Sequence, residues 1–400
     1  MADAPPGMLA LATREHLPVL DGVRGLALIL VVWGHLGNCV RPLPPDGTAE
    51  RGVFLFFCLS GFLITRILLF DRERSVSGWT FWKRRFVRLM PAALICTALV
   101  TIAMPSTKHL WPLIWVANVV RTIEWDPMGT SPLGHFWSLS AEEQFYAAWF
   151  VPAFFLPRNA SRAIAWGVAL LAPIGCVATA ILWSRLGADP HYVWRAVHLL
   201  PTANALPLFA GATLAFHERA IRSSLWLAPA VAVAFLAVAS QRDLFAGLTH
   251  EAIGGASRVA FETAWLALSH QFFAVGLFAL CLYRPLTDRF DLFSSNWLRG
   301  VGRLSYGLYV YHIPFLRAFD AHGRDEYAEP QWWRAALAVG LTTLTAYLSY
   351  RFVEQPVLAW SRRDRTRLSA ELNTEVAPSS TSADAWGVEA TGSSSPRAAA

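Results

Sequence analysis

Apolar stretches of about 20 residues recur along most of this 400-residue chain and constrain its fold more than any other feature. About 20 apolar residues in a helix cross a bilayer core of about 30 Å. Only 16% of the residues are charged and the mean hydropathy is +0.37, whereas soluble domains carry about 25% charged residues. The chain lacks the charges to cover a soluble surface. This excludes an ordinary cytosolic enzyme, a disordered protein and a nucleic-acid binder that is basic throughout.

We predict an all-α, polytopic membrane bundle of about ten transmembrane helices. The expected spans are residues 20–40, 52–70, 89–105, 137–157, 161–183, 197–217, 224–240, 262–283, 303–320 and 333–353. Pro201 and Pro207 interrupt the sixth span, which membrane helices tolerate when neighbours satisfy the freed carbonyls. Residues 1–17 are expected to form an N-terminal segment and 18–360 the membrane domain. Residues 361–400 read as a basic and then disordered tail, rich in Ser, Thr, Ala and Gly.

Basic residues are unevenly spread over the predicted loops. Arg and Lys are more frequent in the even-numbered loops than in the odd-numbered ones. The even-numbered loops follow the second, fourth, sixth and eighth spans, and the segment after the tenth span is also basic. Cytoplasmic loops are enriched in these residues, so the pattern predicts that both termini are cytoplasmic. The Ala-, Arg-, Trp- and Pro-rich composition indicates a GC-rich bacterial genome. We therefore expect a multi-pass protein of the bacterial inner (cytoplasmic) membrane.

Arg24 and His35 both lie in the first predicted span, LDGVRGLALILVVWGHLG. Their spacing corresponds to about three helical turns and about 16 Å of rise, so both side chains are expected on one face. A charge inside a membrane helix is costly and marks a functional site by default. The alternative is an arginine that reaches the headgroups and a histidine bonded to a neighbouring backbone.

The basic segment WTFWKRRFVRLMP, residues 79–91, is a second candidate site, at the predicted cytoplasmic mouth of the third span. Arg85 and Arg88 are three positions apart, so they share a helix face, and Arg84 lies beside them. Arginine forks match pairs of phosphate oxygens. The segment therefore suits a cofactor with several phosphates. The alternative is a segment that only sets the topology.

Two adjacent carboxylates, Glu142 and Glu143, lie in GHFWSLSAEEQFYAAWF about one turn into the fourth predicted span. Adjacent residues point to different faces, so we expect one carboxylate in the interior and the other toward a loop or water. A buried glutamate needs a partner, and His35 would form a His–Glu couple for acid–base chemistry. The alternative is an interfacial turn with both carboxylates hydrated. His312, in the ninth span, is expected to be a hydrogen-bonded structural residue.

Taken in order, these motifs resemble the membrane-bound acyltransferase family 3, which includes polysaccharide O-acetylases and macrolide O-acyltransferases. The resemblance covers about residues 18–356. It rests on LDGVRGLALILVVWGHLG, FLFFCLSGFLITRIL (54–68), FWKRRFVRLMPA (81–92), HFWSLSAEEQFY (135–146) and LSYGLYVYHIP (304–314). One segment departs from the family. Many members carry an Arg and an Asp before a Leu-Leu-x-Gly run in the sixth span, whereas PTANALPLFAGATLA here has Asn204 and no acid.

The resemblance implies transfer of an acetyl or other short acyl group from cytoplasmic acyl-CoA to a hydroxyl, usually on a sugar. Carried onto this sequence, it implies that His35 is the essential histidine and Arg24 its paired arginine. Glu142 matches the glutamate of the family's motif, with Glu143 as the second choice. In this mechanism His35 removes the acceptor proton and Glu142 orients it. Direct transfer and an acyl-histidine intermediate both remain open.

Arg85 and Arg88 match the family's arginine pair and are implied to bind the CoA phosphates, with Arg84 as a further contact. The implied co-substrate is acyl-CoA, with no metal. The implied partners are a carbohydrate or a glycosylated small molecule such as a macrolide as acceptor, and the lipid bilayer, without nucleic acid. The competing class is a multi-span transporter or permease, which would show no dependence on acyl-CoA.

Overall fold

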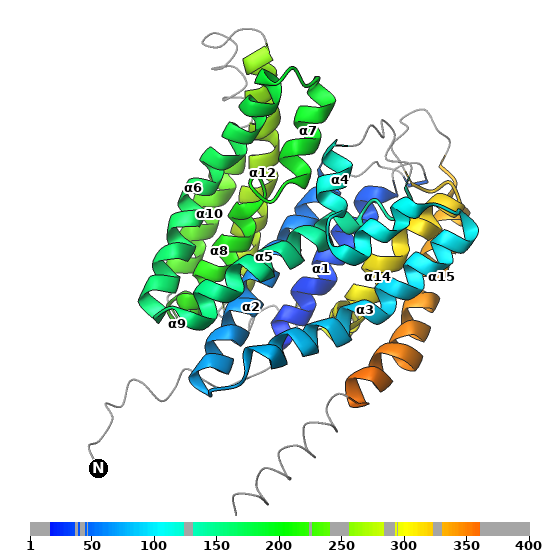
Figure 1. Ribbon diagram of the computed structural model, residues 1–400, viewed down its shortest axis with the longest axis horizontal. Coiled ribbons are helices and arrows are strands. Elements are labelled where there is room, and N and C mark those ends of the chain that lie inside the picture. Colours follow the sequence, from blue (N-terminus) through cyan, green and yellow to red (C-terminus); the bar gives the residue numbers. More distant parts are fainter. Residues whose placement is uncertain are drawn as a thin grey trace, which may run out of the picture.

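The computed structural model describes residues 17–36, 39–40, 45, 47–123, 131–223, 226–240, 256–283, 293, 295–322 and 330–360. Within these ranges the chain folds into a bundle of helices with no strand (Figure 1). The helices are α1 (Pro18–His35), α2 (Thr48–Glu73), α3 (Gly78–Ala103), the 3-10 helix η1 (Thr107–Ile114), α4 (Ala117–Ile123), α5 (Phe136–Phe155), α6 (Arg158–Arg185), α7 (Pro190–Leu199), α8 (Ala205–Phe216), α9 (Glu218–Ser223), α10 (Leu227–Ser240), α12 (Ala256–Leu282), α14 (Asn296–Ala318) and α15 (Trp332–Ser349), followed by a π-helical turn at Tyr350–Glu354.

The predicted all-helical fold is confirmed for the described residues, and each of the ten predicted spans contains a helix. Five helices are long and apolar enough to cross a membrane: α1, α2, α3, α6 and Arg258–Leu282 within α12. The chain is therefore a multi-pass membrane protein. The count of ten spans and the sides of the termini stay predictions. The predicted tail, residues 361–400, and residues 1–16 lie outside the described residues.

The sixth predicted span, 197–217, is two helices rather than one. α7 and α8 are separated by a short break that contains Pro201. Proline has no N–H and clashes with the preceding turn, so it interrupts a helix. The buried side chain of Asn204 spans the break: its Nδ2 donates to the carbonyl oxygens of His198 at 2.8 Å and Leu200 at 3.0 Å. The asparagine that departs from the family pattern thus bonds two carbonyls at the break, and that of Leu200 also accepts from the backbone N–H groups of Ala203 and Asn204.

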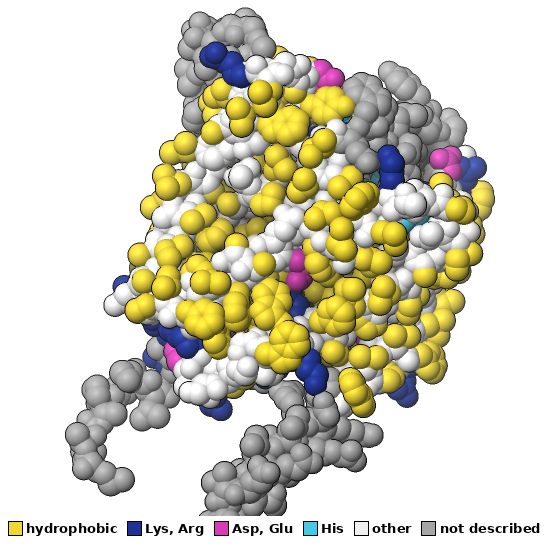
Figure 2. All heavy atoms as spheres, in the orientation of Figure 1, with side chains coloured by type: hydrophobic (Ala, Val, Ile, Leu, Met, Phe, Trp, Pro, Cys, Tyr) yellow, Lys and Arg dark blue, Asp and Glu magenta, His cyan; other side chains and the backbone are white. Residues whose placement is uncertain are grey.

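The outside of the bundle is largely apolar. Figure 2 shows one face on which hydrophobic side chains cover the middle and charged side chains lie mainly towards two opposite ends. Large apolar side chains are exposed along α6, among them Leu170, Leu171 and Ile174. Extensive exposed apolar surface of this kind suits a lipid environment.

Two glycines let α2 and α8 pack backbone against backbone. A Cβ built on Gly61 would overlap the carbonyl oxygen of Leu208, and one built on Gly211 would overlap the carbonyl oxygen of Cys58. Small residues allow membrane helices to approach this closely. The contact matters for function because the same stretch of α2 carries side chains of the pocket described below.

We expect Gly211→Ala to lower the thermal unfolding midpoint of the purified protein in detergent. The added methyl group overlaps a backbone carbonyl, and overpacking of this kind costs about 1–3 kcal/mol. Gly167→Ala in α6 is the matched control, because no atom lies within 4 Å of its Cβ position. Unfolding followed by tryptophan fluorescence measures both variants. Equal midpoints for the two would contradict the prediction.

Candidate functional site

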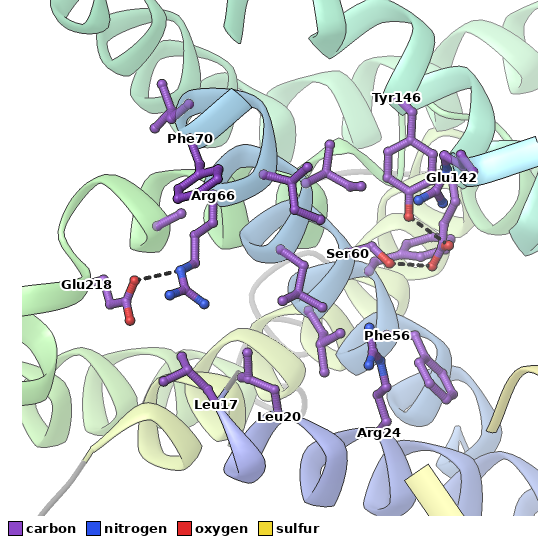
Figure 3. Close-up of a pocket in the computed structure, with 18 of the residues that line it drawn as sticks. Leu17, Leu20, Arg24, Phe56, Ser60, Arg66, Phe70, Glu142, Tyr146 and Glu218 are labelled. Carbon is purple, nitrogen blue, oxygen red and sulfur yellow. Dashed lines mark hydrogen bonds and ion pairs between the residues drawn. The ribbon is translucent and has the colours of Figure 1, made fainter. Parts of the chain in front are cut away.

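A cavity of about 860 Å³ lies among α1, α2, α3, α5, α9 and α14. Its surface end is charged and partly exposed, and contains Arg66, Glu73, Arg158, Glu218 and Arg222. Its buried end contains Ser60, Ser138, Glu142, Tyr146 and Tyr309. Figure 3 shows the ion pair of Arg66 with Glu218 on one side, and Ser60, Glu142 and Tyr146 on the other. Apolar side chains of α1 and α2, such as Leu20, also line the pocket.

The two adjacent carboxylates of α5 face different helices. Glu142 accepts hydrogen bonds from Ser60 of α2 and from Tyr146, each at 3.0 Å. Glu143 forms an ion pair with Arg85 of α3, with Nε and Oε1 2.9 Å apart. Neighbouring residues of a helix point about 100° apart, so α5 connects to α2 and α3 at once. Both carboxylates therefore lie inside the protein, and neither faces a loop.

Three of the arginines predicted from the sequence line the pocket: Arg24, Arg85 and Arg88. The guanidinium of Arg85 lies 3.4 Å from the ring centroid of Tyr146, in addition to its ion pair. Arg24 lies 3.3 Å from Asp21, three residues earlier on α1. Arg88 is exposed, and it forms no ion pair within the described part of the chain. Arg88 is therefore the arginine of the three best placed to receive an anion.

Arg84 does not join this group. Its Nη1 lies 3.2 Å from Oδ2 of Asp71, a buried carboxylate near the end of α2, and neither residue lines the pocket. Arg84 and Arg88 are four positions apart and are therefore neighbours on the surface of α3, but Arg84 pairs with Asp71 whereas Arg88 lines the pocket. The structure thus separates Arg84 from the predicted phosphate-binding pair and gives it a local partner instead.

His35 lies outside the pocket, in a cluster of four histidines that we call the histidine cluster. Its ring centroid is 5.3 Å from that of His312 and 5.4 Å from that of His322, and the rings of His135 and His312 are 5.0 Å apart. His312 donates from Nδ1 to the carbonyl oxygen of Tyr309 at 2.6 Å. It is hydrogen-bonded, as expected, and also contacts His35. Within the described ranges no group of three or more His, Cys, Asp or Glu side chains could hold a metal ion.

The predicted couple between His35 and Glu142 is not formed. Glu142 shares the pocket with Arg24, near the start of α1, whereas His35 is the last residue of that helix. Eleven helical residues rise by about 16 Å. Glu142 bonds to Ser60 and Tyr146 instead. A shared helix face was therefore not enough to bring His35 into the pocket.

Tyr309 and Ser138 lie between the pocket and the histidine cluster. Both line the buried end of the pocket, and their hydroxyl oxygens are 2.5 Å apart. The ring centroid of Tyr309 is 5.5 Å from that of His135 and 5.3 Å from that of His312. Neither residue stands out in the sequence. The motifs HFWSLSAEEQFY and LSYGLYVYHIP marked the right segments, but nothing in them shows that the two hydroxyls meet.

These features define a class: a multi-pass helical membrane protein with a charged binding pocket buried among its helices. A family model described as an acyltransferase domain matches residues 17–351. The chain belongs to this family, the membrane-bound acyltransferase family 3.

Three named proteins are similar to this chain. The chain is similar to "Peptidoglycan O-acetyltransferase OatA" of Listeria monocytogenes, with 30% identity over 387 residues, 86% of this chain and 56% of the relative. It is 26% identical to "Putative peptidoglycan O-acetyltransferase YrhL" of Bacillus subtilis over 398 residues, 88% of this chain and 57% of the relative. It is also 26% identical to "O-acetyltransferase OatA" of Staphylococcus aureus over 365 residues, 86% and 57% of the two chains. The chain thus spans just over half the length of these relatives. No solved structure matches it.

Breaking the ion pair between Arg85 and Glu143 should destabilise the protein. We expect Glu143→Ala to lower the free energy of unfolding by about 3–5 kcal/mol, because it leaves a buried guanidinium without its counter-charge. Arg85→Met combined with Glu143→Leu should recover most of this loss, since no buried charge then remains. Thermal unfolding of the single and double variants in detergent measures the coupling. Additive losses would show that the pair does not act as a unit.

Proposed function

We propose that this chain is a membrane O-acyltransferase that moves an acetyl or other short acyl group from acyl-CoA to a hydroxyl of a cell-wall glycan. The pocket carries the proposal, because it combines an available arginine, an apolar lining and a buried end rich in hydroxyl groups. Membership of the acyltransferase family supports the reaction type. Two of the relatives are named for peptidoglycan, which favours a cell-wall glycan over a macrolide as acceptor.

In this proposal the ten helical spans cross the bacterial inner membrane with both termini in the cytoplasm. The surface end of the pocket then faces the cytoplasm, because α1 begins there and α2 ends there. His35, at the opposite end of α1, lies towards the outer side. A donor therefore enters from the cytoplasm, where acyl-CoA is made, and a cell-wall acceptor approaches from the other side.

The pocket suits a donor that is anionic at one end and apolar further along. Cavities of roughly 300–1,000 Å³ hold small-molecule ligands, and this one lies in the upper part of that range. Arg88 binds a phosphate of CoA, with Arg85 and Arg24 close enough to add charge. The apolar side chains of α1 and α2 line the path of the pantetheine arm. The thioester then reaches the buried end.

The chemistry divides between the two sites. Neutral His35 acts as general base and removes the proton of the acceptor hydroxyl. Glu142 cannot orient His35 by direct contact, so its role is to hold Ser60 and Tyr146 at the buried end. It also adds a negative charge beside the arginines of the pocket. In this proposal donor binding and base catalysis lie apart along α1, since Arg24 and His35 are about three helical turns apart.

We expect Arg88→Gln to raise the KM for acetyl-CoA by about 10–100-fold, because a hydrogen bond to a charged group is worth about 1.5–3 kcal/mol. Arg84→Gln is the matched control. It removes a charge one turn away on the same helix, outside the pocket, and its amide can still bond Asp71. Its KM should change by less than about 3-fold, within the scatter of surface substitutions. Steady-state kinetics in detergent or membranes measure both, and equal KM changes would contradict the assignment.

We expect His35→Ala to abolish acceptor-dependent release of CoA, with a loss of at least about 10²-fold, the typical contribution of a general base. His109→Ala is the matched control, because His109 bonds Thr101 and lies outside both the pocket and the histidine cluster. Membranes containing each protein are assayed with a panel of short acyl-CoAs. Each assay is run with peptidoglycan fragments, with a macrolide, and without acceptor.

Release that requires peptidoglycan fragments and His35 supports the proposal. Release only with the macrolide would move the acceptor to glycosylated natural products. No CoA release with any donor from a folded, inserted protein would favour a transporter or permease instead.

A further inference from the structure

Two hydroxyl groups close the buried end of the pocket. The Oη of Tyr309 on α14 and the Oγ of Ser138 on α5 are 2.5 Å apart, and both residues line the cavity. Each hydroxyl also lies within hydrogen-bond distance of the carbonyl oxygen of His135, at 3.1 Å from Tyr309 and 3.2 Å from Ser138. The pair is buried, so water competes little for its hydrogens.

The hydroxyl hydrogens of Tyr309 and Ser138 can be arranged so that the hydrogen of Tyr309 is not used within the pair. Three contacts join these two hydroxyls and the His135 carbonyl, but a hydroxyl carries only one hydrogen. If Ser138 donates its hydrogen to the Oη of Tyr309, the hydrogen of Tyr309 is free to turn towards the pocket. The backbone N–H of Ser138 also approaches the same carbonyl, at 3.4 Å. The carbonyl therefore stays satisfied when Tyr309 gives its hydrogen to another acceptor.

The other side of Tyr309 faces the histidine cluster, in which two ring nitrogens have no hydrogen-bond donor among the described residues. His135 donates from Nε2 to the carbonyl oxygen of Val310 at 3.0 Å, and His312 donates from Nδ1 to that of Tyr309. A backbone carbonyl only accepts, so Nδ1 of His135 and Nε2 of His312 carry lone pairs. Both atoms are buried and have no hydrogen-bond partner in the described part of the chain. An incoming hydroxyl group would supply the missing donor.

We infer that Tyr309, supported by Ser138, binds the carbonyl oxygen of the donor's acyl group at the boundary between the pocket and the histidine cluster. The inference rests on the proposed function, since it needs an acyl thioester in the pocket. It adds a residue that touches the reacting atoms and fixes where the acyl group lies. The carbonyl carbon is then presented towards the side from which the acceptor hydroxyl arrives.

This placement has a role in the reaction. As the acceptor oxygen bonds to the carbonyl carbon, the electron pair of the C=O bond moves onto its oxygen, and the acceptor proton passes to His35. The negative charge on the oxygen is stabilised by the hydrogen of Tyr309. The C=O bond then re-forms, the C–S bond breaks, and CoA leaves as a thiolate. Donors placed in advance at such an oxygen act mainly on kcat.

We expect Tyr309→Phe to lower kcat by about 10²-fold, as does the loss of one such donor elsewhere, while the KM for acetyl-CoA stays within about 3-fold. Tyr311→Phe is the matched control. Tyr311 is a buried tyrosine two residues further along α14, and its hydroxyl lies within hydrogen-bond distance of the Ala92 carbonyl oxygen and the Ser349 hydroxyl, outside the pocket. Ser138→Ala should lower kcat less than Tyr309→Phe, and Ser138→Thr should restore it. Similar kcat values for Tyr309→Phe and Tyr311→Phe would overturn the inference.

A spectroscopic measurement separates carbonyl binding from a structural role. Acetyl-CoA labelled with ¹³C at the carbonyl is bound to the full-length protein without acceptor, and the isotope-edited infrared difference spectrum gives the C=O stretch. We expect a lower frequency in the wild type and in Tyr311→Phe than in Tyr309→Phe, because a hydrogen bond weakens the C=O bond. Ser138→Thr should retain the wild-type frequency.

The outcomes distinguish this inference from the proposed function. Wild-type protein that binds and turns over acetyl-CoA but shows the same C=O frequency as Tyr309→Phe would overturn the inference alone. If Tyr309→Phe does not fold, the wild-type and Ser138→Ala frequencies decide in its place, and equal values overturn the inference. Wild-type protein that neither binds acetyl-CoA nor releases CoA would overturn both.

Discussion

A charge inside a membrane helix must be compensated, and the ion pair between Arg85 and Glu143 provides that compensation beside the pocket. The same guanidinium stacks on Tyr146, so α3 and α5 meet at one point. Because adjacent residues of a helix point about 100° apart, fixing Glu143 towards α3 turns Glu142 towards Ser60 of α2. One ion pair thus arranges polar groups from three helices around the buried end of the pocket.

The second constraint is the length of α1. Arg24 lines the pocket and His35 ends the helix in the histidine cluster, so a single rigid element carries one residue of each site. α14 does the same, with Tyr309 at the pocket and His312 three residues further on in the cluster. α1 and α14 pack against each other along the bundle. The two sites therefore keep a fixed separation, and Ser138 and Tyr309 lie between them.

The sequence was enough to predict the helical fold, the segments that contain spans, and three arginines and two carboxylates that line the pocket. These follow from local signals, since apolar length indicates a span and a charge within it indicates a site. The pairing of partners could not be read in the same way. Glu142 bonds a serine 82 positions earlier in the chain, and no local pattern of residues encodes which helix α5 faces. The partner of Arg84 could not be predicted either, because Arg85 and Arg88 line the pocket while Arg84 pairs with Asp71.

The hydroxyl pair of Ser138 and Tyr309, which separates the two sites, also affects how far an acyl donor is protected from reaction with water. An activated acyl group reacts with water unless the site excludes it. The surface end of the pocket is partly open, with side chains of Arg158 and Glu73 about one-third exposed, whereas Ser138 and Tyr309 are buried. In the proposed mechanism, a donor bound along this gradient places its phosphates where water is present and its thioester where water is scarce. Separation of the pocket from the histidine cluster then works in favour of transfer, because it shields the acyl group until an acceptor hydroxyl replaces water on the far side of Tyr309.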